Sequence, residues 1–170
     1  MLLRLIGGIL VITGATAVGA VKAHRYYNTI TLLKELERGM ELVRSQMNYT
    51  LYPIPKLLDI TGTQLKGDAG TYFIQLGKAI SNGVPRHLAY REAMAFTGEL
   101  LLPDDALMAL IEWSETLGQF DPEGENALMK VSINRLHKSY TNYSEDKSSM
   151  VKSYTLLGAS AGISLLILMI

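Results

Sequence analysis

Histidine is the side chain best suited to metal binding and proton transfer near neutral pH, and this chain has three, His24, His87 and His137. Each stands alone in its segment, and no two lie three or four residues apart, so no helix can present a histidine pair to a metal ion. The chain has no cysteine, which excludes disulfides, thiol catalysis and cysteine-bound metals. The sequence therefore predicts no metal ion and no cofactor, and it places the three histidines at the surface.

Carboxylates are the next candidates for chemistry, and they cluster at Asp104-Asp105 and at Asp121-x-Glu123-x-Glu125. Such groups suit Ca²⁺ or Mg²⁺, but neither cluster has the spacing of a calcium-binding loop. Both stand where a helix is expected to begin, and there an acidic side chain caps the helix or favours the positive end of its dipole. Because phosphate-binding and nucleophile-elbow motifs are also absent from the sequence, we expect no catalytic residue and no enzyme activity.

Charges are balanced in number but unevenly distributed along the chain. There are 16 basic and 16 acidic residues, so no net charge favours nucleic acid as a partner. Residues 92–129 hold nine acidic residues and no Lys or Arg, whereas residues 22–91 hold ten basic residues against five acidic ones. We call residues 92–129 the acidic segment. It predicts either a solvated face that merely orients the domain or a docking patch for a basic partner, with the docking residues Glu112, Glu115, Asp121, Glu123 and Glu125.

Both ends of the chain are apolar. Residues 5–21 and residues 153–170 are two uncharged runs of 17 and 18 residues. As helices each is about 26 Å long, which is the lower limit for crossing the hydrocarbon core of a bilayer. The sequence therefore predicts transmembrane segments at residues 1–21 and 153–170, which also makes membrane lipids a partner.

Basic residues next to the two predicted spans indicate which side of the membrane the middle of the chain occupies. Lys22, Arg25, Lys147 and Lys152 all lie on the inner flanks of the spans, so the middle, residues 22–152, is expected to form a cytoplasmic domain. The alternative is that the first span is a secretory signal cleaved near Val18-Gly19-Ala20. The chain would then be a secreted or membrane-anchored extracytoplasmic helical binding domain.

Small residues in the two predicted spans indicate helix packing within the membrane. Gly158 and Gly162 form a GxxxG motif, and Ala15 and Gly19 have the same spacing. Such notches let helix backbones approach closely in lipid. They serve equally to pair the two spans of one chain or to build a homo-oligomer.

Between the spans, apolar residues recur at helical spacing and prolines mark the boundaries. The stripe Leu33, Leu36, Met40, Val43 and Met47 continues from the first span without a break until Pro53. Later helices are expected to begin at Pro55, after a turn at Gly67-Asp68-Ala69-Gly70, at Pro85, at Asp104 or Asp105, and at Pro122. The predicted fold is all-α, a six-helix bundle with N- and C-terminal helices that continue into transmembrane segments.

Three motifs in a fixed order give the chain a family resemblance. They are Tyr49-Thr50-x-x-Pro53, Leu117-Gly118-x-x-Asp121 and Leu157-Gly158-x-x-x-Gly162. In this order and spacing the chain resembles the stage III sporulation protein AB family over essentially its whole length. The resemblance implies a component of the channel between mother cell and forespore, located in the mother-cell membrane that faces the forespore (the outer forespore membrane).

The same resemblance implies a fold and a set of partners. The fold would be a helical bundle like the cytoplasmic domain of type II secretion inner-membrane platform proteins, which couple a secretion ATPase to the export machine. By that analogy the partners would be the cytoplasmic sporulation secretion ATPase encoded alongside the chain and other channel membrane proteins.

Overall fold

The computed structural model describes residues 2–49, 52–97, 102–119 and 123–145, and it describes the backbone alone for residues 2–23 and 48. The chain divides into two compact units. The larger unit is Thr29–Asn142, and the smaller one combines Met1–Asn28 with Tyr143–Ile170.

Helices account for the architecture of the described residues, which contain no strand. The elements are α1 (Leu2–Tyr49), α2 (Ile54–Gln64), α3 (Gly67–Ser81), α4 (Arg86–Ala95) and α5 (Asp104–Thr116), followed by a further helix at residues 123–145. Six helical segments confirm the predicted all-α, six-helix fold.

The helix boundaries follow the prolines, with two corrections. The predicted turn at Gly67–Gly70 is instead the first turn of α3, which begins at Gly67. Pro53, Pro85 and Pro103 are the N-cap residues of α2, α4 and α5, because proline is compatible with the edge of a helix and not with its interior. The prediction that Asp104 or Asp105 caps α5 was wrong. Both lie inside its first turn without a side-chain cap hydrogen bond, where their charge favours the positive end of the helix dipole.

The core of the larger unit forms along the predicted stripe of α1. Leu33, Leu36, Met40 and Val43 are all fully buried, as the three-to-four spacing requires for one face of a helix. The aromatic centre comes from α3 and α5, where the rings of Phe73 and Trp113 lie 5.4 Å apart in an edge-on contact. Burial of this apolar surface is the main driving force for the fold.

The helix α2 packs against α3 at very short range because glycines face each other. A Cβ added at Gly70 would lie 2.7 Å from the carbonyl oxygen of Gly62 and 2.9 Å from that of Leu65. Both neighbours are backbone atoms, so no side chain could move aside to make room. The absence of a Cβ at Gly70 therefore sets the distance between these two helices.

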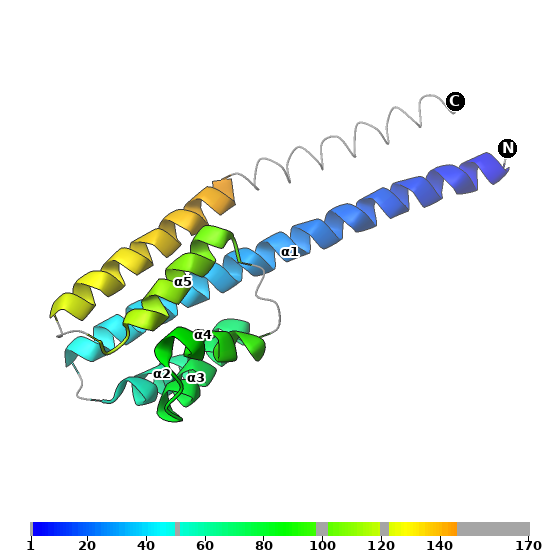
Figure 1. Ribbon diagram of the computed structural model, residues 1–170. Helices are drawn as coiled ribbons and strands as arrows, with labels where there is room; N and C mark the ends of the chain where they lie inside the picture. Colours follow the sequence, from blue (N-terminus) through cyan, green and yellow to red (C-terminus); the bar gives the residue numbers. More distant parts are fainter. Residues whose placement is uncertain (1, 50–51, 98–101, 120–122, 146–170) are drawn as a thin grey trace. The chain divides into compact units, whose positions relative to one another are not determined.

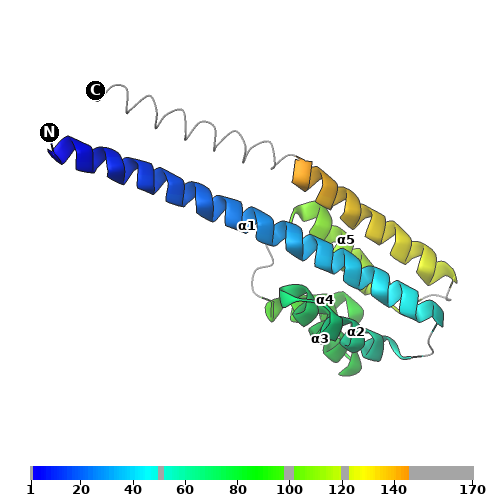
Figure 2. The ribbon, with the colours of Figure 1, turned by 180° about the vertical axis from the view of Figure 1, so that it is seen from behind.

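Three long helical segments lie side by side in the larger unit (Figures 1 and 2). Residues 29–49 of α1 run antiparallel to the helix at residues 123–142, as two contacts show. Arg44 Nη1 donates to Asn126 Oδ1 over 3.2 Å, and His137 Nδ1 lies 2.8 Å from Glu37 Oε1. Glu112 of α5 forms an ion pair with Arg135 of the helix at residues 123–142.

In the smaller unit, tyrosines join the two chain segments. The rings of Tyr26 and Tyr143 stack with centroids 5.8 Å apart. The Tyr26 hydroxyl donates to the carbonyl oxygen of Ser144 over 3.1 Å. The part of α1 that follows the first apolar run thus contacts the chain shortly before the second one.

No helix among the residues with described side chains is long and apolar enough to cross a membrane. The predicted spans at residues 1–21 and 153–170 lie outside the residues whose side chains are described. So do the packing residues predicted for them, which are Ala15, Gly19, Gly158 and Gly162.

Candidate partner-docking site

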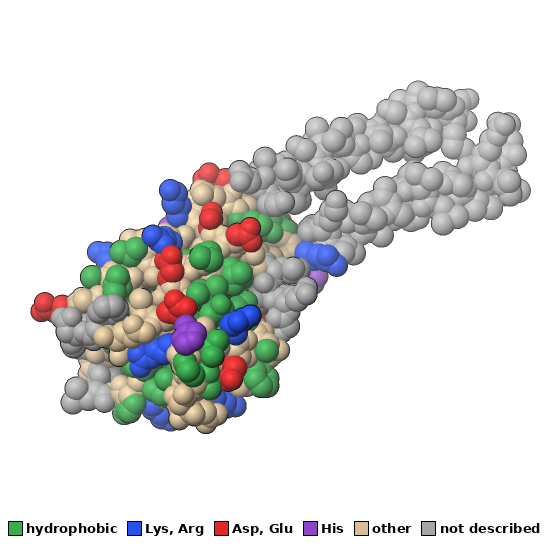
Figure 3. Space-filling model, in the orientation of Figure 1, with side chains coloured by type: hydrophobic (Ala, Val, Ile, Leu, Met, Phe, Trp, Pro, Cys, Tyr) green, Lys and Arg blue, Asp and Glu red, His purple; other side chains and the backbone are tan. Residues whose placement is uncertain are grey.

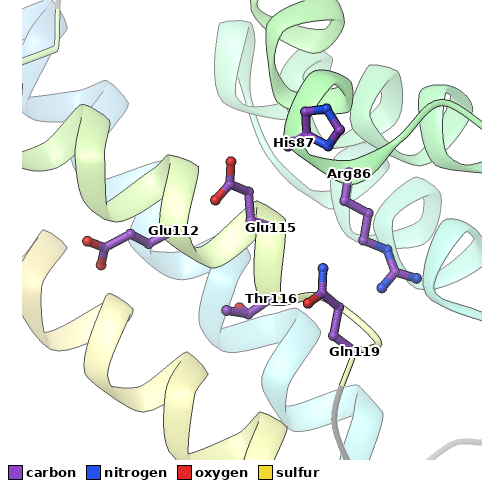
Figure 4. A pocket seen from close by; sticks show the side chains of 6 residues that line it. All are labelled: Arg86, His87, Glu112, Glu115, Thr116 and Gln119. Atoms are coloured by element: carbon purple, nitrogen blue, oxygen red, sulfur yellow. The ribbon is translucent and has the colours of Figure 1, made fainter.

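A polar groove of about 550 Å³ lies in the larger unit, between the beginning of α4 and the second half of α5 (Figure 4). Its lining residues share a capacity for charge or hydrogen bonding and are Arg86, His87, Glu112, Glu115, Thr116 and Gln119. We call this feature the groove. It combines side chains from segments more than twenty residues apart in the sequence.

Local backbone structure places each wall of the groove. Because α4 begins directly after Pro85, its first two residues, Arg86 and His87, stand at the rim. The other wall ends where α5 ends, and there Gly118 adopts a φ of 68°. Glycine reaches this left-handed conformation without a steric penalty, which turns the chain so that Gln119 faces the groove.

The two walls carry opposite charges. Glu112 and Glu115 come from α5, and Arg86 comes from α4. In Figure 4, Glu112 and Glu115 project from α5, and Arg86 extends beside Gln119. On the face shown in Figure 3, Lys and Arg side chains likewise lie among those of Asp and Glu. The fold therefore brings basic groups to a segment that has none of its own.

Glu125 stabilises the turn behind the groove. It is only 3% exposed, and its carboxylate accepts a hydrogen bond from the backbone N–H of Gly118. Burial raises the pKa of this carboxyl, while the hydrogen bond from Gly118 and the nearby Arg86 guanidinium act in the opposite direction. The buried carboxylate thus links the last helix to the end of α5.

The five predicted docking residues therefore differ in their environment. Glu112 and Glu115 line the groove. Glu123 is exposed at the beginning of the last helix. Asp121 lies outside the described residues. Glu125 was predicted on a surface and is instead buried, because its oxygen satisfies the backbone donor of Gly118. It is not available to a partner.

Substituting Glu125 with glutamine is expected to flatten the pH dependence of stability. The folded state holds the Glu125 proton more tightly than the unfolded state does, so wild-type stability should fall as pH rises from the ordinary glutamate range through the raised pKa. Glutamine cannot ionise, yet its amide oxygen can still accept from Gly118. Urea unfolding followed by circular dichroism between pH 4 and 8 measures the effect.

The exposed residue Glu123 supplies the matched control. The variant Glu123→Gln should keep the wild-type pH dependence. If Glu125→Gln also keeps it, the raised pKa of Glu125 contributes nothing to stability.

The basic half of the groove was not predicted from the sequence. Arg86, His87 and Gln119 were not predicted as site residues, because nothing in the local sequence indicates that α4 begins opposite α5. All three histidines are exposed, as predicted. Within the described ranges, no three His, Asp or Glu side chains are grouped so that they could hold a metal ion.

The fold and the groove define an all-α helical bundle protein with a polar surface site. A family model described as stage III sporulation protein AB matches residues 4–170. The chain belongs to this family, as its motifs predicted, and its general role is in sporulation.

Other comparisons bear on the fold. A solved structure titled stage III sporulation protein AB matches with a TM-score of 0.62 and 17% sequence identity, covering 69% of this chain and 94% of that one. At this identity the likeness supports the helical fold alone. No curated protein sequence matches the chain.

Proposed function

We propose that this protein is a non-catalytic membrane platform of a secretion-like sporulation channel between mother cell and forespore. It docks a cytoplasmic secretion ATPase through the groove and the exposed carboxylates around it. The observation that carries this proposal is the groove itself, in which the carboxylates of Glu112 and Glu115 are accessible on α5. A partially exposed, charged concave surface favours recognition of another macromolecule by charge complementarity.

The position of the groove within the larger unit supports a docking role. A Cβ added at Gly118 would lie 3.1 Å from Arg86 Nη2 and 3.3 Å from Ile54 Cγ1. The turn at Gly118 thus lies beside the start of α2, the helix that follows α1 in the chain. The part of α1 that belongs to this unit begins at Thr29 and ends at Tyr49. It is about 30 Å long.

In the proposed arrangement the apolar runs at residues 5–21 and 153–170 lie in the mother-cell membrane that faces the forespore. In this arrangement the domain that carries the groove lies in the mother-cell cytoplasm. The other channel proteins would contact the chain in the membrane, through Ala15, Gly19, Gly158 and Gly162.

Reversing three solvent-accessible carboxylates should abolish recovery of the ATPase. We expect the variant Glu112→Lys, Glu115→Lys and Glu123→Lys to retain less than about a tenth of the wild-type ATPase yield, because like charges replace attractive ones. The measurement is affinity purification of the tagged full chain from detergent-solubilised membranes of sporulating cells. Helical circular dichroism should persist, since the lost Glu112–Arg135 ion pair is exposed and worth at most about 1 kcal/mol.

A matched control reverses three acidic residues elsewhere, Glu41, Asp59 and Glu92, with the same change in net charge. This control should recover the ATPase at the wild-type level. The proposal is wrong if the groove variant also does so, or if the wild-type chain recovers no ATPase.

A further inference from the structure

The groove carries charges of both signs, and this limits which partner segment can bind there. Its α5 wall contributes Glu112 and Glu115, and its α4 wall contributes Arg86, with His87 beside it. A segment with basic side chains alone would satisfy the first wall and meet a like charge at the second. Uncompensated like charges in a binding site oppose association and create specificity.

The charged groups differ in how free they are to accept a partner. Glu112 is held by Arg135, but the two side chains are 43% and 58% exposed, so a partner cation can replace this pairing at small cost. Glu115 and Arg86 form no ion pair within 4.0 Å among the described residues. Each therefore has capacity for an opposite charge.

Arg86 also lies beside the turn that follows α5. The Cβ position of Gly118 lies against its guanidinium, and the charge of buried Glu125 is close enough to influence it. Because the Glu125 carboxylate already accepts the N–H of Gly118, it fixes the turn against which Arg86 packs. The arginine guanidinium is planar and presents its donors as a fork, which suits a carboxylate.

We propose that the groove binds a segment of the partner that carries a basic and an acidic side chain together, the basic one against Glu115 and the acidic one against Arg86. Thr116 and Gln119 line the same groove and supply both donors and acceptors for the backbone of that segment. The inference rests on the proposed docking function and specifies its chemistry.

Two neutralising substitutions test the inference with the secretion ATPase as the probe. The full chain in detergent is immobilised and ATPase binding is measured by biolayer interferometry. Arg86→Gln and Glu115→Gln should each weaken binding about tenfold, since each removes one charge-assisted contact. Arg86→Lys should restore part of the loss, because it keeps the charge without the planar fork.

Lys138 provides the matched control. It is exposed on the helix at residues 123–145 and does not line the groove, so Lys138→Gln changes net charge as Arg86→Gln does and should leave binding unchanged. Thermal unfolding of each variant identifies any loss of fold. If folded Arg86→Gln binds like wild type while Glu115→Gln does not, the partner is purely basic. The inference then fails, although the docking function stands.

Synthetic peptides test the groove without the ATPase. Three helical peptides of equal length carry, four residues apart, a Lys–Glu pair, two Lys residues or two Glu residues. In NMR titrations of the full chain, the mixed peptide should shift the Gln119 side-chain amide at about a tenfold lower concentration than either of the others. Equal or better binding by the two-Lys peptide would overturn the inference. Absence of ATPase binding to the wild-type chain would instead overturn the proposed function.

Discussion

Replacing Trp113 with alanine is expected to lower the free energy of unfolding by about 3–5 kcal/mol, as for other large aromatic side chains removed from a core. Trp113 is fully buried and packs edge-on against Phe73. Its removal leaves a cavity in the core of the larger unit, and the surrounding helices relax only partly to fill it. Urea unfolding of the full chain in detergent, followed by circular dichroism, measures the loss.

The variant Trp113→Phe tests whether the loss of stability comes from packing alone. Within the described residues, Nε1 of Trp113 has no hydrogen-bond partner, so phenylalanine loses volume but no polar contact and should cost clearly less than alanine. Phe96 is 67% exposed and serves as the control, since Phe96→Ala should change stability by no more than about 0.5 kcal/mol. Equal losses for Trp113→Ala and Phe96→Ala would contradict the central role of Trp113.

A single added methyl group at Gly70 is expected to destabilise the protein by about 1–3 kcal/mol through overpacking. On an open helix the same change would stabilise by about 0.5–1 kcal/mol, because alanine is the better helix former. The sign is reversed here because the new Cβ would lie 2.7 Å from the Gly62 carbonyl oxygen. To relieve that contact α2 would have to move away from α3.

Thermal and urea unfolding of Gly70→Ala measure this effect. Ser81, the exposed last residue of the same helix, provides the control, and Ser81→Ala should leave stability nearly unchanged. Unaltered or raised stability in Gly70→Ala would show that α2 and α3 can separate without cost, against the close packing described above.

The aromatic core also contains the buried hydroxyl of Tyr72. Burial raises the pKa of this phenol above its usual range, and a hydrogen bond with the Ser114 side chain acts in the opposite direction.

Much of the fold was predictable because it depends on local rules. Proline cannot continue a helix, so Pro53 and Pro85 marked boundaries that the structure confirms. The stripe from Leu33 to Val43 recurs at helical spacing, and its residues are buried. Capping was harder to predict, because Pro103 and the two aspartates after it all tolerate a helix start. The choice among them depends on backbone geometry that neighbouring elements fix.

The candidate site was only half predictable. The acidic side chains Glu112 and Glu115 stood out as part of a long run without positive charge. The burial of Glu125 could not be predicted, because it depends on where Gly118 directs its N–H after the end of α5. Likewise, Arg86 is 26 residues before Glu112 in the sequence, and nothing along that distance indicates that the two face the same groove.

The sequence by itself determined the helices, their boundaries and the uneven distribution of charge, because periodicity, proline and charge are properties of a residue and its close neighbours. Only the tertiary structure decided that Arg86 and Arg135 meet the acidic α5, that Glu125 lies inside the fold, and that the candidate site has two signs of charge. Such pairings depend on how helices distant in sequence pack, and that packing is set by the contacts of the whole core.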